Sequence, residues 1–174
     1  PPRVCRSTPP GPAMTDARVA VDLPDERAMT ALAERLAPAV GGGGVLFLRG
    51  DLGAGKTTFA RALLRALGVG ERIKSPTYSL IETYRVPAVA PLERAIHHLD
   101  LYRIADPGEL EWLGLPDLCG EASLLVVEWP ERGGDALPGA DLLIDLAYAD
   151  RGRRSILHAL TPRGADWLAA LGPG

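Results

Sequence analysis

Cysteine and long apolar segments are scarce in this 174-residue chain, and it carries no excess of basic charge. Cys5 and Cys119 are the only cysteines, so the sequence predicts no disulfide framework. No apolar run approaches the ~20 residues that span a membrane, and residues 1–13 contain no apolar segment typical of a secretory signal. A net charge of −3 excludes a global basic field for nucleic acid. We therefore expect a cytoplasmic protein that makes no contact with a membrane.

The charge distribution has one local exception, a basic cluster at Arg151, Arg153 and Arg154. Such clusters are usually solvated surface, and contact with a partner or RNA is the less expected alternative. The apolar fraction of 47% is sufficient for a core. We expect residues 1–13, which are rich in proline, to form a disordered tail. Residues 14–174 are expected to form a single domain.

Two amide side chains are absent, because the chain contains no asparagine and no glutamine. The Asn-Lys-x-Asp motif with which GTPases recognise guanine is therefore excluded. A glutamine that positions the attacking water, as in Ras-like proteins, is excluded as well. Any nucleotide site in this chain is expected to favour adenine, and the isolated chain is expected to hydrolyse nucleotide slowly.

Residues 50–57 read Gly-Asp-Leu-Gly-Ala-Gly-Lys-Thr, the G-x-x-x-x-G-K-T pattern of a phosphate-binding loop. Glycines allow backbone N–H groups to turn towards phosphate oxygens. Lys56 is expected to reach the β- and γ-phosphates and to contribute to catalysis, and the Thr57 hydroxyl is expected to bind Mg²⁺. The predicted nucleotide-binding residues of this loop are Asp51, Leu52, Gly53, Ala54, Gly55, Lys56, Thr57 and Thr58.

The loop pattern is informative only between a strand and a helix, and the sequence predicts both. Residues 45–48 are a short apolar run, typical of a buried parallel strand. Residues 58–67 are rich in helix formers, place Phe59 and Leu63 on one face and end before Gly68. Motif and context together make a structural glycine-rich turn the weaker interpretation.

Two acidic residues are predicted to complete the site. Glu128 follows the apolar residues 124–127 at the carboxyl end of a predicted strand, where open α/β sheets bind ligands. Asp100 also ends a predicted strand. A carboxylate at such a position can bind Mg²⁺ or orient the attacking water, so both residues are candidate metal ligands and candidate catalytic groups. The alternative for Glu128 is an acidic strand end that faces solvent.

The neighbouring histidines look like a metal pair. The two-residue period of a strand, however, places His97 and His98 on opposite faces, so structural roles are favoured for both. The same period places His98 on the face that carries Asp100.

Thr77 and Trp129 are further candidates for contact with the nucleotide. Thr77 lies in a loop after the phosphate-loop helix, where GTPases have a threonine that senses the γ-phosphate and Mg²⁺. A plain turn is nearly as well supported there. Trp129 directly follows the acidic Glu128, and the pattern alone leaves open whether its ring belongs to the core or lies over the nucleotide.

Strands and helices are expected to alternate along most of the chain. The predicted strands are residues 18–23, 45–48, 78–86, 95–101, 124–127, 142–148 and 154–160. The predicted helices are residues 24–39, 58–67, 107–113 and 163–171. This order predicts an α/β fold: a single P-loop NTPase-like three-layer domain with a mostly parallel central sheet and antiparallel additions.

Four motifs of the chain occur in the order found in a known family. They are the phosphate loop, Ser75-Pro76-Thr77-Tyr78, His98-Leu99-Asp100-Leu101-Tyr102-Arg103 and Glu128-Trp129-Pro130. The series resembles the bacterial TsaE (YjeE) ATPases of tRNA threonylcarbamoyladenosine biosynthesis over roughly residues 18–160. The set of four is far more specific than the phosphate loop alone.

The resemblance implies a compact P-loop ATPase that uses ATP and Mg²⁺. It also implies the TsaD and TsaB proteins as partners, an indirect relation to tRNA through their complex, and an ATP cycle that resets or licenses this complex. In this sequence the family's functional positions correspond to Lys56 and Thr57 for phosphate and Mg²⁺, Asp100 and Glu128 for Mg²⁺ and hydrolysis, Trp129 beside the site, and Thr77 in the switch-like loop.

Two other functions remain open. A small-molecule kinase would also need a phosphate loop, but it requires an arginine-rich lid and an acceptor pocket, for which residues 131–134 offer little. A nucleotide-gated binding module would bind nucleotide with negligible turnover. ATPase rates measured with and without the partners would distinguish such a module from an ATPase.

Overall fold

The computed structural model describes residues 17–70, 72–74, 76, 79–87, 93–120 and 122–172. The strands of this part of the chain are β1 (Arg18–Leu23), β2 (Gly44–Arg49), β3 (Ile81–Pro87), β4 (Glu93–Asp100), β5 (Ser123–Glu128), β6 (Leu142–Tyr148) and β7 (Arg153–Ala159). The α-helices are α1 (Glu26–Val40), α2 (Lys56–Ala66), α3 (Leu115–Leu118) and α4 (Pro162–Leu171). Three 3₁₀-helices are described as well: η1 (Pro107–Leu113), η2 (Pro130–Arg132) and η3 (Gly134–Ala136).

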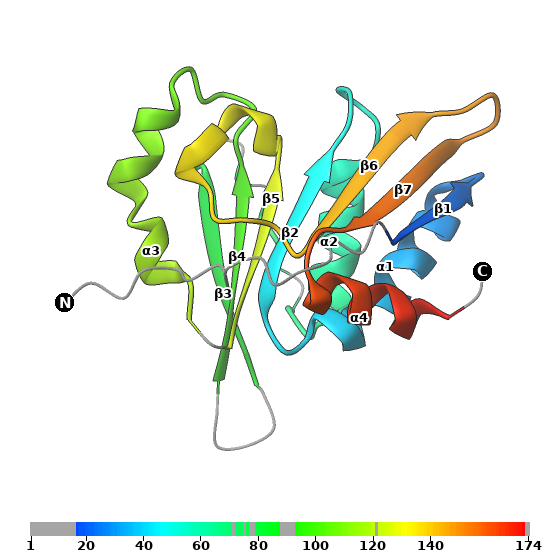
Figure 1. Cartoon of the computed structure of the whole chain (residues 1–174), viewed down its shortest axis with the longest axis horizontal. Helices are drawn as coiled ribbons and strands as arrows, with labels where there is room; N and C mark the ends of the chain where they lie inside the picture. The colour runs from blue at the N-terminus through cyan, green and yellow to red at the C-terminus, as the bar shows by residue number, and fades with distance from the viewer. Residues whose placement is uncertain are drawn as a thin grey trace.

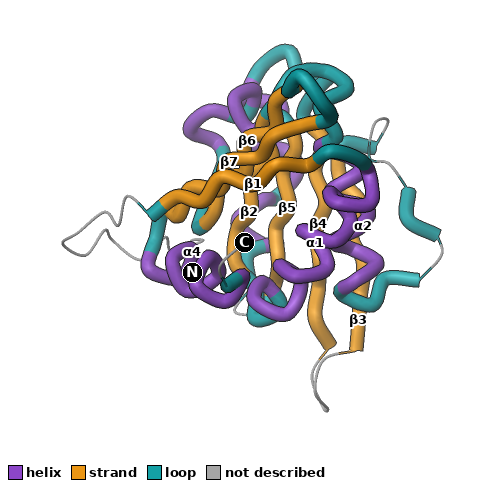
Figure 2. The backbone as a smooth tube through the Cα atoms, turned by 90° about the vertical axis from the view of Figure 1, so that its right-hand side faces the viewer, coloured by secondary structure: helices purple, strands orange, loops and turns teal. Residues whose placement is uncertain are grey.

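All the described strands belong to one sheet, with the order β1-β7-β6-β2-β5-β4-β3. The four central strands, β6, β2, β5 and β4, are parallel to one another. Antiparallel pairs flank them on both sides: β7 with β6 and β1, and β3 with β4. Figure 2 shows β6, β7 and β1 side by side. The predicted parallel centre with antiparallel additions is therefore confirmed.

Both faces of the sheet are covered, as the central strand β5 illustrates. Leu124 and Val126 lie in a core cluster with residues of α1, α2 and α4, whereas Leu125 and Val127 lie in a second cluster with residues of η1 and α3. A strand that is apolar on both faces is typical of a parallel strand between two helical layers. Figure 1 shows α3 on the other side of the strands from α1 and α2, so the predicted three-layer α/β fold is confirmed.

The helices that pack beside the phosphate loop form where the sequence predicts them. Asp25 caps α1 by accepting a hydrogen bond from the Ala28 backbone N–H at 2.8 Å. The predicted inner face of this helix, which includes Leu32 and Leu36, is buried. In α2 the side chain of Phe59 is fully buried, so the helix that follows the loop is fixed against the core.

The structure corrects the predicted start of one strand. The sequence predicts a strand from residue 78, but β3 begins at Ile81. The preceding residue, Leu80, has a φ of 62°, a left-handed conformation that a strand cannot include. Residues 77 and 78 lie outside the described residues.

Three features of the predicted organisation have different outcomes. Cys119, directly after α3, is disulfide-bonded. The prediction that the chain has no disulfide framework is therefore wrong for this cysteine. Residues 1–13 lie outside the described residues, and the predicted tail and single domain stay predictions. In the described part of the chain, every helix is too short or too polar to cross a membrane.

Candidate functional site

Three neighbouring parallel strands end at the same edge of the sheet and carry the predicted site residues. The phosphate loop follows β2, Glu128 ends β5, and Asp100 ends β4. Glu128 is paired in register with Leu48 of β2 on one side and with Asp100 of β4 on the other. The parallel register therefore brings together residues that are far apart in the sequence, at the edge where open α/β sheets bind ligands.

The glycines of the phosphate loop adopt conformations that other residues rarely reach. Gly50, Gly53 and Gly55 have φ values of 149°, 78° and 109°. Gly55 occupies the N-cap position of α2. No side chain caps the helix there, so the N–H groups of its first turn are not bonded to a capping side chain. A helix N-terminus with unsatisfied N–H groups is suited to bind a phosphate.

We expect Gly50→Ala to weaken both folding and nucleotide binding. A Cβ atom at this position would lie 2.2 Å from the Leu146 carbonyl oxygen, and the φ of 149° is unfavourable for alanine. Strain of ~1–3 kcal/mol corresponds to a loss of about 2–12 °C in melting temperature for a protein of this size. Gly42→Ala is the matched control, because nothing lies within 4 Å of its added Cβ. Thermal unfolding and nucleotide titration of both variants test the expectation, which an unchanged Gly50→Ala variant would contradict.

Lys56, the first residue of α2, is only 4% exposed. Its Nζ donates hydrogen bonds to the carbonyl oxygens of Gly50 at 2.6 Å and Asp51 at 2.8 Å. Burial lowers the pKa of the Lys56 ammonium, and nearby carboxylates, Glu128 first among them, oppose that shift. The ammonium is thus positioned at the phosphate loop, where it contacts neutral carbonyl oxygens that an anion can replace.

Trp129 covers the ammonium group of Lys56. Its φ of 58° is unusual for a residue other than glycine, and its backbone N–H donates to the Leu48 carbonyl oxygen at 3.2 Å. The centroid of its ring lies 3.9 Å from the Lys56 Nζ and 5.1 Å from the centroid of the Tyr102 ring. The ring also packs against the core cluster below the site. Its position therefore combines a core contact with an attractive cation–π contact to the loop lysine.

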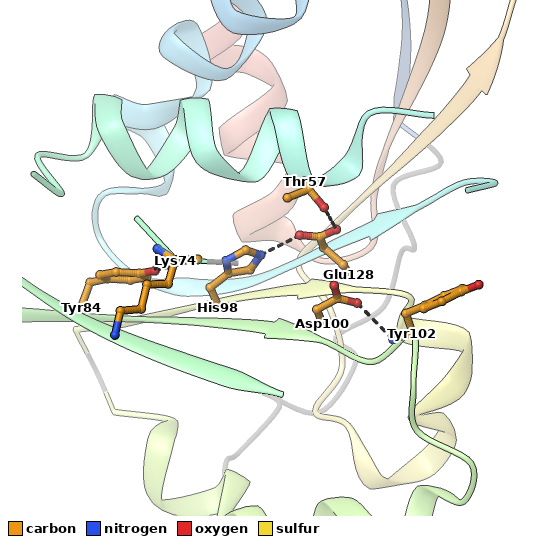
Figure 3. Close-up of polar contacts among 7 residues, drawn as sticks. All are labelled: Thr57, Lys74, Tyr84, His98, Asp100, Tyr102 and Glu128. Carbon is orange, nitrogen blue, oxygen red and sulfur yellow. Dashed lines mark hydrogen bonds and ion pairs between the residues drawn. The ribbon is translucent and has the colours of Figure 1, made fainter. Parts of the chain in front are cut away.

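Glu128 connects the phosphate loop to the neighbouring strand. Its Oε2 accepts a hydrogen bond from the Thr57 hydroxyl at 2.7 Å, and its Oε1 lies 2.7 Å from the His98 Nε2. Figure 3 shows the three side chains in a row, with the carboxylate in the middle. Glu128 is 1% exposed, so the alternative of an acidic strand end that faces solvent is wrong.

Asp100 lies beside this row and is also buried (Figure 3). Its Oδ1 accepts a hydrogen bond from the Tyr102 backbone N–H at 3.0 Å. Burial raises the pKa of the Asp100 carboxyl, the hydrogen bond from Tyr102 lowers it, and the nearby Glu128 raises it further. Two acidic groups in one buried location favour the binding of a cation between or beside them.

The oxygen atoms at this edge fit Mg²⁺. The Thr57 hydroxyl donates its proton to Glu128, which leaves the oxygen lone pairs available for a metal ion. No group of three or more histidine, cysteine, aspartate or glutamate side chains suited to a metal ion occurs within the described ranges. Mg²⁺ at nucleotide sites uses one or two carboxylates together with substrate phosphates, so these few oxygens are sufficient if a nucleotide supplies the rest.

Two residues that sequence reasoning did not assign to the site contact the phosphate loop from the β6–β7 hairpin. The Tyr148 hydroxyl donates to the Leu52 carbonyl oxygen at 2.9 Å, and Arg153 donates to the Gly53 carbonyl oxygen at 3.1 Å. The Arg153 guanidinium also lies 4.1 Å from the centroid of the Tyr148 ring. These contacts use carbonyl oxygens, so they fix the loop without occupying an N–H group that a phosphate needs. Part of the basic cluster is therefore attached to the site, while Arg154 forms an exposed ion pair with β1.

The structure brings together Lys56, Thr57, Asp100, Glu128 and Trp129, as the sequence predicts. Thr77 lies outside the described residues, and its place in a switch-like loop stays a prediction.

The segment after α2 is attached to β3 through one tyrosine. The Tyr84 hydroxyl accepts a hydrogen bond from the Lys74 backbone N–H and donates to the Lys74 carbonyl oxygen, each at 3.1 Å (Figure 3). This reciprocal contact fixes the backbone three residues before Thr77.

Sequence comparison connects this chain to a described family. The family model "Threonylcarbamoyl adenosine biosynthesis protein TsaE" matches residues 23–156. The protein of this name from Haemophilus influenzae is 42% identical over 126 residues, which cover 72% of this chain and 77% of that protein. The Aquifex aeolicus protein of the same name is 35% identical over 127 residues, covering 72% of this chain and 84% of its own length.

Structural comparison gives a consistent result. The chain is similar to the crystal structure of YdiB from Bacillus subtilis, with a TM-score of 0.67 and 27% sequence identity. The match covers 89% of this chain and 93% of YdiB. The structural similarity therefore extends over most of both chains.

Proposed function

Because this chain belongs to the TsaE family of threonylcarbamoyl adenosine biosynthesis proteins, we propose that it binds Mg-ATP at the phosphate loop and hydrolyses it. The proposed purpose of hydrolysis is to reset or license the TsaD–TsaB complex, which modifies tRNA. The protein then meets tRNA only indirectly, through that complex. The proposed location is the cytoplasm, where ATP and tRNA are available.

The observation that carries this proposal is the hydrogen bond between Thr57 and Glu128. It joins the phosphate loop to the acidic end of β5 at 2.7 Å, across 71 positions of sequence. A hydroxyl from the loop and a carboxylate from a neighbouring strand are the usual protein ligands of Mg²⁺ in P-loop NTPases. Mg²⁺ bound there would neutralise the phosphate charge that develops during hydrolysis.

The remaining site residues have complementary roles in this proposal. Lys56 would exchange its two carbonyl partners for phosphate oxygens, because a charge-assisted hydrogen bond to an anion is stronger than one to a neutral carbonyl. Trp129 would restrict water at the loop lysine. Asp100 would serve the metal or the attacking water from the adjacent strand.

Slow hydrolysis by the isolated chain is consistent with the contact between Glu128 and the phosphate loop. The Thr57 hydroxyl occupies part of the acceptor capacity of Oε2, so release of this hydrogen bond would free Oε2 for Mg²⁺ or water while His98 still holds Oε1. A partner complex that favours this rearrangement would stimulate hydrolysis. The absence of asparagine and glutamine from the chain supports ATP over GTP as the nucleotide.

The role in tRNA modification is tested by following many rounds of adenosine modification by purified TsaD and TsaB. With ATP present, addition of this chain is expected to sustain product formation beyond the first round. A variant that binds ATP but lacks the Glu128 carboxylate is expected to leave the reaction at that first round. Sustained product formation by TsaD and TsaB alone would contradict the proposed role.

A further inference from the structure

The neighbouring histidines of β4 have different surroundings. His97 lies towards β3, where its Nδ1 is 2.9 Å from the Thr83 hydroxyl. His98 lies on the opposite face, towards the phosphate loop, and its Nε2 is 2.7 Å from the Glu128 Oε1. The two residues are therefore a natural matched pair: the same side chain on one strand, with only one inside the site.

The contact between His98 and Glu128 is completely removed from water. Their side chains are 0% and 1% exposed. A buried carboxylate is strongly destabilised unless hydrogen bonds compensate for the water it has lost. Thr57 compensates one oxygen and His98 the other, so the geometry of the carboxylate depends on both neighbours.

The unpaired ring nitrogen of His98 shows which group donates the hydrogen bond between His98 and Glu128. Within the described residues the buried Nδ1 has no hydrogen-bond partner. A proton on Nδ1 would therefore be a buried donor without an acceptor, which is costly. The tautomer that avoids this cost carries its proton on Nε2, so His98 donates to Glu128 and does not accept from it.

We propose that His98 is a positioning residue that fixes the Glu128 carboxylate for the chemical step. The proposal rests on the proposed function, because it assumes that Glu128 serves Mg²⁺ and hydrolysis. The terminal torsion of a glutamate is broad, so a carboxylate anchored at one oxygen can rotate. The hydrogen bond from His98 to Oε1 restricts this rotation and directs Oε2 towards Thr57 and the nucleotide side of the site.

His98→Leu and His98→Gln test the proposal through the rate of ATP hydrolysis with TsaD and TsaB present. The leucine variant removes the donor and is expected to lower the rate at least ~10-fold, while the ATP dissociation constant stays within about threefold. Glutamine can place an N–H group near the same position, so His98→Gln is expected to recover part of the rate. His97→Leu and His97→Gln are the matched controls, and their rates are expected to stay within about threefold of the wild type.

Two outcomes of the kinetic experiment would overturn the proposal. One is a folded His98→Leu variant with the wild-type rate. The other is a parallel loss of ATP binding and hydrolysis, since a merely structural role would affect both.

A second measurement does not depend on hydrolysis. Imidazole ¹⁵N NMR of the free wild-type protein is expected to show His98 as the Nε2–H tautomer, and a ring protonated at Nδ1 would overturn the proposal. Thermal unfolding of His98→Leu, Glu128→Gln and the double variant is expected to be non-additive, because the two side chains are in contact. Additive effects would overturn the proposal as well. If the wild type hydrolyses no ATP with its partners, the proposed function fails, while these two readouts still decide whether His98 fixes Glu128.

Discussion

Lys56→Ala is expected to abolish useful ATP binding. The Lys56 ammonium is buried at the loop, with Nζ within 2.8 Å of two backbone carbonyl oxygens. When ATP binds, phosphate oxygens would replace these carbonyl oxygens as partners of Nζ. Each new charge-assisted hydrogen bond would contribute ~1.5–3 kcal/mol. Loss of two such bonds is expected to raise the dissociation constant of ATP at least ~100-fold, because each ~1.4 kcal/mol of binding free energy changes that constant tenfold. Isothermal titration of ATP in the presence of Mg²⁺ measures this directly.

The chain contains a natural control for this experiment. Lys74 is the only other lysine in the sequence, and it is exposed. Its contacts with Tyr84 use backbone atoms, which Lys74→Ala retains. The dissociation constant of Lys74→Ala is expected to stay within about threefold of the wild type. A folded Lys56→Ala variant that binds ATP as well as Lys74→Ala would contradict the assignment of the phosphate loop.

Glu128→Gln is expected to separate binding from hydrolysis. The glutamine side chain has nearly the same shape and can still bond to Thr57 and His98, so the variant should fold and bind ATP. It lacks the negative charge that Mg²⁺ and the attacking water require. Loss of a positioned catalytic group lowers a rate by ~100-fold or more, which is the expected effect on hydrolysis with the partners present.

Glu131→Gln is the matched control, since it removes the same charge three residues later at an exposed position. We expect its hydrolysis rate to stay within about threefold of the wild type. Asp100→Ala is expected to resemble Glu128→Gln, with largely intact binding and slow hydrolysis. Wild-type rates in both the Glu128 and the Asp100 variants would show that the proposed metal and catalytic groups are wrong.

The parts of the site that are local in sequence could be predicted from the sequence. The phosphate loop combines a motif with the strand before it and the helix after it, so β2, the loop and α2 are specified within about thirty residues of one another. Glu128 was identified because an apolar strand ends at that residue. The family resemblance rests on such local motifs, and the family match over residues 23–156 confirms it.

The parts that depend on the order of the strands could not be predicted in the same way. Periodicity placed His98 on the face of Asp100, but only the pairing of β4 with β5 brings its ring to Glu128. The sequence interpretation favoured a structural role for it. Likewise, Tyr148 contacts a loop residue 96 positions away, and no local pattern encodes that approach.

The measurement that tests the central claim most directly is ATP hydrolysis by the wild type and by Glu128→Gln, each with and without purified TsaD and TsaB. We predict slow hydrolysis by the wild type alone, clear stimulation by the two partners, and no stimulation of Glu128→Gln although it still binds ATP. A wild-type rate that the partners leave unchanged would contradict the proposed function. Equal stimulation of Glu128→Gln would contradict the role assigned to the carboxylate at the end of β5.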